Sequence, residues 1–374
     1  MKKSIAMLLS LAMAASLTAC GGGSKPAETP APESTTTAAA ADTSEEAKTE
    51  AAADGAEDPF AALGDFVMTI GHAQPEGNPR YVSMEKFAAD VAEKTNGHVK
   101  VEVYGNGQLG TEKEMLEQVV AGTIQGMRGG QFDFSPRLLM FTLPFLTQNR
   151  AQITALMQSD LAKKVCTEAE AETGTVILSL CDAGGYRQFS NSKHPITKPE
   201  DLKGLKMRTN GMNTIDKTFI AMGATTTTIP YSDLYMGLKT SVADGQENPW
   251  VNVEGMKFYE VQKYFTEVNY QFHPDPFYVN ATWWNALPTE YQEIIQACAD
   301  EMSVYNDQLI DENQNAAKQV VIDAGCEVYE PTEDELKVFQ EAVQVVYDQC
   351  IEEGMLTAEE LKEMQDIVDR KSVV

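Results

Sequence analysis

Glycine spacing near residue 105 gives the chain one pattern that could bind a cofactor. Gly105, Gly107 and Gly110 form a GxGxxG motif between an expected strand and an expected helix, as in a dinucleotide-binding loop. The same glycines suit a turn into a capped helix, because Thr111 and Glu114 have capping-box spacing. The first residues are expected to form an export signal, as described below, and nicotinamide cofactors are not expected outside the cell. We therefore interpret the motif as a turn and expect no cofactor.

The histidines and acids are not arranged as in hydrolases or metal sites. None of the 4 histidines belongs to an HExxH motif, and the chain has no GxSxG nucleophile motif. The acids lie mostly on helical faces, so their spacing does not predict a catalytic carboxylate pair. No cysteines have CxxC spacing, which argues against a metal site or a redox motif. We therefore predict neither an enzyme nor a metal-binding protein.

The cysteines after Cys20 are odd in number, so at least one is unpaired within a monomer. We interpret them as buried thiols and leave one disulfide open. These cysteines are Cys166, Cys181, Cys298, Cys326 and Cys350.

The first 20 residues resemble a secretion signal that ends in a lipid attachment site. Two lysines precede an apolar stretch from residue 4 to 17, which is too short to span a bilayer. Residues 17–20 read LTAC and resemble the lipobox of bacterial lipoproteins. The resemblance implies a diacylglyceryl group on Cys20, and two acyl chains give a stable membrane anchor. A cleaved signal with an incidental cysteine is the alternative.

Composition predicts a disordered tether over residues 21–64, because Pro, Ala, Thr, Ser, Gly and Glu dominate there and cannot form a core. The whole chain has a formal net charge of -27. Nucleic acid is therefore an unsuitable partner, since binding it relies on Lys and Arg. An anionic ligand would need a local cluster of arginines to overcome the repulsion from this negative net charge.

Alternating strands and helices predict an α/β fold in two lobes. The expected strands are 66–72, 99–103, 124–128 and 175–181, and then 205–208, 224–229 and 242–246, with helices between them. This alternation favours mainly parallel sheets, and about 310 residues suit two lobes. Helices are also expected over 150–172, and, after residue 288, over 289–324, 332–353 and 357–370.

Several sequence motifs occur together in one order. They are NGQLG (106–110), LPF (143–145), GGYRQFSNS (184–192), PEDLKGLKMR (199–208), YSDLYMGLK (231–239), DGQENP (244–249) and KFYEVQKY (257–264). In this order and spacing they resemble the DctP-type solute-binding proteins of TRAP (tripartite ATP-independent periplasmic) transporters, over essentially all of residues 66–350.

The resemblance implies the two-lobed, type II periplasmic-binding-protein-like fold. Lobe I would comprise residues 66–185 and about 273–312, and lobe II residues 186–272 and about 313–374, with C-terminal helices packing across the lobes. The ligand would be an organic acid in the cleft between the lobes, which close on it by a hinge. Sugar acids such as uronates, or C4-dicarboxylates, are the leading ligand classes.

Three ligand contacts follow from the resemblance. Arg208 takes the place of the arginine that forms a bidentate pair with the ligand carboxylate, a geometry that a planar guanidinium suits. Arg187 matches a second arginine of the cleft. Asn248 matches an amide that hydrogen-bonds the same carboxylate.

Other positions are expected to contact the remainder of the ligand. Tyr231 falls where the family often has an aromatic side chain against the ligand. His72 and Arg128 end strands of the other lobe, and we expect them to contact the far end of the ligand, since ligands gather at the carboxyl ends of strands. Gln131 is the alternative contact in the stretch around Arg128.

The sequence therefore predicts an extracytoplasmic, lipid-anchored binding protein that delivers its ligand to a TRAP membrane permease. An ABC-type binding protein, a ligand-sensing subunit of a signalling receptor and a surface hydrolase are the alternatives. The ABC-type protein shares the architecture but would not carry DGQENP.

Overall fold

The computed structural model describes residues 58–132 and 134–370. The predicted signal and lipobox and the predicted tether up to residue 57 lie outside the described residues. Residues 58–64, the last of the predicted tether, belong to the folded unit instead. Phe60 packs with its ring centroid 5.6 Å from that of Tyr291, and Asp58 pairs with His98. In the part of the chain that the structure describes, no helix is long and apolar enough to cross a membrane.

The first sheet has five strands in the order β2-β1-β3-β10-β4. They are β1 (Phe66–Gly71), β2 (Val99–Tyr104), β3 (Gly126–Arg128), β4 (Thr175–Asp182) and β10 (Pro274–Asn280). The four strands before β10 were predicted by pattern. β10 was not, because it opens on the sequence Pro-Asp-Pro, and proline is rare inside sheets. β10 runs antiparallel to both β3 and β4.

The second sheet has six strands in the order β11-β9-β5-β8-β6-β7. They are β5 (Arg187–Asn191), β6 (Lys206–Thr209), β7 (Thr225–Thr228), β8 (Gly245–Pro249), β9 (Tyr264–Thr266) and β11 (Glu327–Tyr329). β5 is antiparallel to both of its neighbours, β8 and β9. In each sheet a single strand, β10 or β5, runs against the others, so the sheets are mixed but mainly parallel and the predicted α/β class is confirmed.

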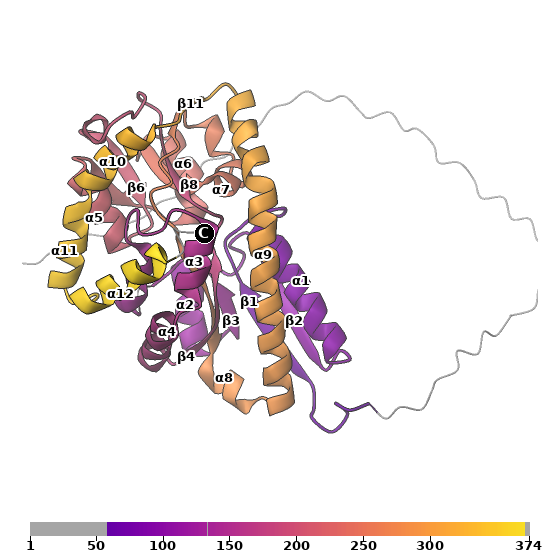
Figure 1. Ribbon diagram of the computed structural model, residues 1–374. Coiled ribbons are helices and arrows are strands. Elements are labelled where there is room, and N and C mark those ends of the chain that lie inside the picture. The colour runs from indigo at the N-terminus through magenta and orange to yellow at the C-terminus, as the bar shows by residue number, and fades with distance from the viewer. Residues whose placement is uncertain (1–57, 133, 371–374) are drawn as a thin grey trace, which may run out of the picture. The chain divides into compact units, whose positions relative to one another are not determined.

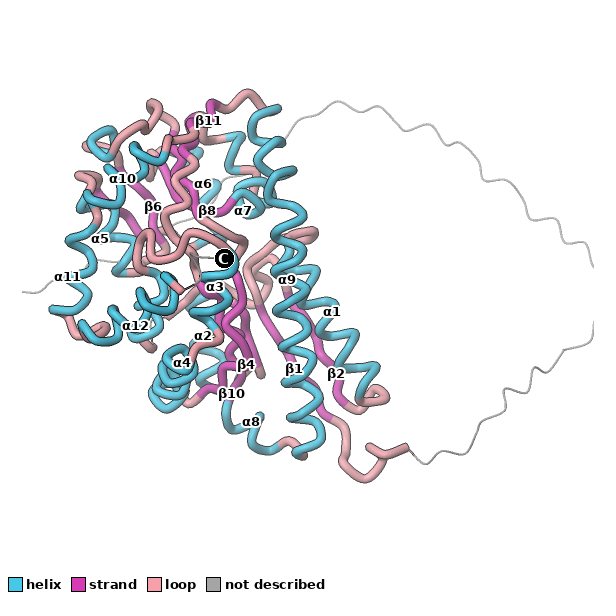
Figure 2. The backbone as a smooth tube through the Cα atoms, in the orientation of Figure 1, coloured by secondary structure: helices cyan, strands magenta, loops and turns pink. Residues whose placement is uncertain are grey.

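Helices cover both sheets (Figures 1 and 2). Those before the second sheet are α1 (Pro79–Lys94), α2 (Glu112–Ala121), the 3-10 helix η1 (Pro136–Thr142), α3 (Arg150–Met157) and α4 (Asp160–Thr173). α2 begins with the predicted capping box of Thr111 and Glu114, so the GxGxxG motif is a turn into this helix. The single helix predicted over 150–172 is two helices, because the Ser159 side chain caps α4.

The remaining helices accompany the second sheet or follow it. They are η2 (Pro199–Leu202), α5 (Asn213–Ala221), η3 (Tyr231–Asp233), α6 (Leu234–Lys239), α7 (Trp250–Gly255), η4 (Phe258–Glu260), α8 (Ala281–Ala286), α9 (Thr289–Asp323), α10 (Glu333–Ala342), α11 (Gln344–Glu352) and α12 (Ala358–Asp369). The helix predicted over 332–353 is thus divided into α10 and α11.

Three segments connect the two sheets. The first is the turn between β4 and β5, where Gly184 and Gly185 adopt φ of 135° and 95°, which only glycine accepts readily. The second is the return from β9 to β10. The third is α9, which packs against α1 and β4 beside the first sheet and against α7 beside the second (Figure 1). α12 packs on α3 and α11 on α5. The C-terminal helices therefore contact both halves of the protein, the first half being built on the first sheet and the second half on the second sheet.

Candidate functional site

Side chains from both sheets surround one small cavity of about 30 Å³. Its lining residues are Gln74, Arg80, Glu112, Gly130, Ala183 and His273 from the first half, and Arg187, Arg208, Asn210, Tyr231, Asn248 and Asn252 from the second. Gln74, Gly130 and Ala183 follow the carboxyl ends of β1, β3 and β4, and Asn210 follows β6. Such strand ends are where open α/β sheets gather ligands. Because the cavity has room for only about two water molecules, a ligand of sugar-acid size requires the two halves to move apart.

Arg208 is the one cation of this cavity without a carboxylate partner among the described residues. Arg208 is 1% exposed, and its Nε donates to the carbonyl oxygen of Ile229 over 2.8 Å. Its Nη2 is buried without a hydrogen-bond partner in the part of the chain that the structure describes. Burial, opposed by Glu247 and assisted by Arg187, lowers the pKa of Arg208 to about 10. The guanidinium is therefore charged at neutral pH, and an anion would satisfy it.

The DGQENP motif holds Arg208 and the residues beside it in place. Asp244 accepts from the backbone N–H of Lys206 over 2.9 Å, which fixes the start of β6. A side chain at Gly245 would collide with the carbonyl oxygen of Ser190 on β5, so only glycine allows β8 to lie there. Gln246 accepts a bond of 2.5 Å from the Asn248 amide. The motif therefore positions the site as well as contributing Asn248 to it.

Arg187 lines the cavity but already has an anionic partner. Its Nε pairs with a Glu247 carboxylate oxygen, and its Nη2 donates to the other carboxylate oxygen over 2.9 Å and to Asn248 Oδ1 over 3.1 Å. Burial lowers the pKa of Arg187, but the adjacent Glu247 charge outweighs burial and raises it above its usual value. Glu247 also accepts from the Tyr270 hydroxyl over 2.7 Å. This pair is a buried, neutral unit.

Arg80 belongs to a second buried group of charges. Its Nη1 lies 2.7 Å from Glu112 Oε1, and its Nε lies 2.7 Å from Asp275 Oδ2. The same Asp275 oxygen lies 3.0 Å from Nε of Arg128. Burial raises the pKa of Asp275 above its usual value, and Arg80 and Arg128 oppose this shift, because a nearby guanidinium favours the ionised carboxylate. Two arginines and two acids thus balance each other.

Neutral polar side chains make up most of the remaining wall and join the two halves. The Tyr231 hydroxyl donates to Gln74 Oε1 over 3.1 Å, and Asn252 accepts from the Asn78 amide over 3.0 Å. Asn252 also donates to the Ala183 carbonyl oxygen over 3.2 Å. These bonds connect the halves in a closed arrangement. Amides and a phenol both donate and accept, which suits ligand hydroxyl groups.

Four of the predicted ligand contacts therefore come together at the cavity: Arg208, Arg187, Asn248 and Tyr231. His72 and Arg128 are fully buried beside the first sheet and do not line it. Nδ1 of His72 accepts from the Gln74 backbone N–H over 3.2 Å, and burial lowers the pKa of His72 to about 3. Arg128 supports the wall through Asp275 and donates to Ser83 over 2.9 Å. Gln131, the alternative, does not line the cavity either.

Sequence reasoning missed eight lining residues: Gln74, Arg80, Glu112, Gly130, Ala183, Asn210, Asn252 and His273. A signal for Arg80 was present, because it precedes Met84, Phe87 and Val91 at helical spacing and so belongs to the apolar stripe of α1. A charged residue at a buried helical position needs a partner or a ligand. Asn210 follows Arg208 at the same strand end, which was a second usable signal.

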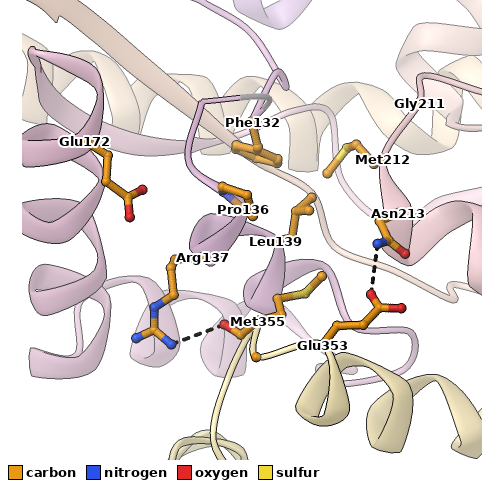
Figure 3. A pocket seen from close by; sticks show the side chains of 11 residues that line it. Phe132, Pro136, Arg137, Leu139, Glu172, Gly211, Met212, Asn213, Glu353 and Met355 are labelled. Carbon is orange, nitrogen blue, oxygen red and sulfur yellow. Dashed lines mark hydrogen bonds between the residues drawn. The ribbon is translucent and has the colours of Figure 1, made fainter.

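A larger pocket of about 560 Å³ lies elsewhere and is lined by other residues (Figure 3). Phe132, Leu139 and Met355 give it apolar walls. Two of its charged side chains are already bonded: Arg137 donates to Glu360 over 2.7 Å and 2.9 Å, and Glu353 accepts from Asn213 over 3.0 Å. None of the predicted ligand contacts is there. We place the site at the smaller cavity because chemistry, rather than size, distinguishes it.

Neither a candidate metal-ligand cluster nor a disulfide is found in the described part of the chain. No group of three or more His, Cys, Asp or Glu residues there could hold a metal ion. The five cysteines after Cys20 are all free thiols in the structure.

Comparisons with known proteins agree with this geometry. The model of bacterial extracellular solute-binding proteins of family 7, DctP, matches residues 70–353. The C4-dicarboxylate-binding periplasmic protein DctP of Rhodobacter capsulatus is 31% identical over 77% of this chain and 87% of that protein.

Two solved structures are also similar. Both are TRAP periplasmic solute-binding proteins. The one from Desulfovibrio salexigens, with bound orotic acid, is 29% identical with a TM-score of 0.77 and covers 81% of this chain and 99% of its own. The one from Chromohalobacter salexigens, with bound D-glucuronate, is 28% identical with a TM-score of 0.74 and the same coverage. The chain therefore belongs to the DctP family of bacterial extracellular solute-binding proteins, which serve TRAP transporters and are not enzymes.

Proposed function

We propose that this protein captures a small organic acid between its two halves and delivers it to the membrane permease of a TRAP transporter. The observation that carries the proposal is Arg208, a buried guanidinium with an unsatisfied Nη2 at the wall of the cavity. A buried charge without a partner is costly, so the site is organised for an anion that arrives from outside. Arg187, Asn248 and Tyr231 complete the same wall.

The ligands of similar proteins support a carboxylate. The relatives described above bind a C4-dicarboxylate, orotic acid and D-glucuronate, and all of these carry a carboxylate group. A sugar acid or a C4-dicarboxylate is therefore the proposed ligand class. The permease is the proposed partner because the family serves TRAP transporters. Because the chain belongs to the DctP family, the ABC-type binding protein considered from the sequence is no longer an alternative.

A thermal-shift screen against organic acids tests the proposal. A ligand at 100 times its Kd stabilises a protein by about 2.7 kcal/mol, which raises Tm measurably. The Arg208→Ala variant serves as the control in the same plate, and its Tm should not respond to the acids that stabilise the wild type. If no sugar acid or dicarboxylate raises the Tm of the wild-type protein, the proposed function is wrong.

We also propose that Cys20 carries the lipid anchor, on the basis of the LTAC sequence. The Cys20→Ala variant should be released from the membrane or remain unprocessed, because the acceptor thiol is gone. Fractionation of cells that express the variant and the wild type measures this. Membrane retention of a processed variant would contradict the anchor at this position.

A further inference from the structure

The positive charges around the cavity exceed the negative charges by one, which limits the number of ligand carboxylates that the site can neutralise. We propose that the site binds hydroxylated acids with a single carboxylate in preference to dicarboxylates, and that Glu112 sets this preference. The proposal rests on the proposed function, since it concerns the same cavity. It also chooses between the two ligand classes that the sequence left open.

The charge inventory is the first step. Arg187 is neutralised by Glu247, and Arg80 and Arg128 are balanced by Glu112 and Asp275. Arg208 alone has no carboxylate partner among the described residues. Asp182, close by, is bonded to Arg150 over 2.5 Å. One positive charge is therefore left over, and one carboxylate neutralises it.

The buried histidines do not alter this inventory. His273 lines the cavity, and burial lowers its pKa well below the usual value, with Arg187 and Arg80 adding to the shift. Burial likewise lowers the pKa of His72, which accepts a hydrogen bond from the Gln74 backbone N–H. Both rings are neutral at neutral pH, so neither supplies the charge that a second carboxylate would need.

Glu112 makes the cavity unfavourable for a second carboxylate. It lines the cavity opposite the Arg208 half and holds the Nη1 atom of Arg80 at 2.7 Å. The only other lining arginine besides Arg187 and Arg208 in the described residues is thus already occupied. A second ligand carboxylate at that end would lie beside the Glu112 carboxylate in a site shielded from water. Like charges placed together in this way disfavour binding strongly.

The rest of the wall suits hydroxyl groups. Gln74, Asn210, Tyr231, Asn248 and Asn252 are all uncharged and can each donate and accept hydrogen bonds. Glu112 can itself accept from a hydroxyl. Once the halves move apart, an acid with one carboxylate beside Arg208 and hydroxyl groups along the rest of its length would match these side chains. The second carboxylate of an unsubstituted dicarboxylate such as succinate would instead meet uncharged side chains or Glu112.

Calorimetry with matched acids tests the preference on the wild-type protein. Galactonate and galactarate, or gluconate and glucarate, share one skeleton and differ in whether the far end is a hydroxymethyl or a carboxylate. We expect the monocarboxylate of a pair to bind about a hundredfold or more tightly than the dicarboxylate, with succinate also weak. Equal or tighter binding of the dicarboxylates overturns this inference but leaves the proposed function intact. Failure of all these acids to bind, together with no response to any other sugar acid or dicarboxylate in the thermal-shift screen, contradicts the proposed function itself.

The Glu112→Gln variant tests the assigned residue. It removes the negative charge next to Arg80 with little change of shape, so the affinity ratio within a pair should narrow by about tenfold or more. Glu117→Gln is the matched control, because Glu117 is exposed on the same helix and its loss changes the net charge equally. An unchanged ratio in Glu112→Gln, or the same narrowing in Glu117→Gln, would show that Glu112 does not set the preference.

Discussion

The Arg208→Ala variant is expected to lose about 2–5 kcal/mol of ligand-binding free energy, which is the range for removing one partner of a buried charge pair. Among the described residues, the guanidinium has only the Ile229 carbonyl oxygen as a hydrogen-bond acceptor, and its Nη2 is unsatisfied. The ligand carboxylate would therefore be left buried and unpaired in the variant. Isothermal titration calorimetry with the acid found by the thermal-shift screen measures the loss.

Two further variants sharpen this result. Arg208→Lys should also bind poorly, because an ammonium group does not form two parallel bonds with a carboxylate. Lys206→Ala is the control, since it removes an exposed cation from the same strand and should leave affinity nearly unchanged. Wild-type affinity in Arg208→Ala would refute the role of Arg208 as the carboxylate anchor.

Arg208 should also oppose the stability of the ligand-free protein. Replacing buried charged groups with apolar ones is often neutral or stabilising, so Arg208→Met should unfold in urea at the same or a higher concentration than the wild type. A residue kept only for packing would give the opposite result. The combination of lost binding with retained stability would identify Arg208 as a binding residue.

The Asp275→Asn variant is expected to lose about 3–5 kcal/mol of unfolding free energy, the range for breaking a buried ion pair by removing one partner. Asp275 is fully buried and lies within 2.7 Å of Arg80 and 3.0 Å of Arg128. The variant leaves Arg128 buried with no carboxylate beside it among the described residues. Because Arg80 also loses a partner, the wall of the cavity should be disturbed as well.

Urea unfolding followed by circular dichroism measures this effect. Asp334→Asn provides the control, because Asp334 is 91% exposed and pairs with Lys337 at the surface, where ion pairs contribute little. If Asp275→Asn unfolds at the same urea concentration as the wild type, then the Arg80–Asp275–Arg128 group does not stabilise the fold.

The sequence was sufficient to predict features that depend on local pattern. Strands such as β1, β2 and β4 follow from short apolar or alternating runs, and α9 from its uninterrupted helical periodicity. The capping box of Thr111 and Glu114 predicted the start of α2. The ordered motifs from 184 to 264 predicted the family and, through it, four residues of the cavity wall. In each case neighbouring residues along the chain carry the information.

Features that depend on distant residues could be decided only by the tertiary structure. β10 completes the first sheet after the chain has passed through the second, and its prolines, which are rare inside strands, prevented its prediction from the local sequence. Nothing in the sequence pairs Arg128 with Asp275 or Arg187 with Glu247, because each pair joins different strands. These pairings decide which guanidinium remains free. The sequence could therefore indicate several arginines of the cleft, but only folding, by burying acids beside all except Arg208, left one of them for the ligand.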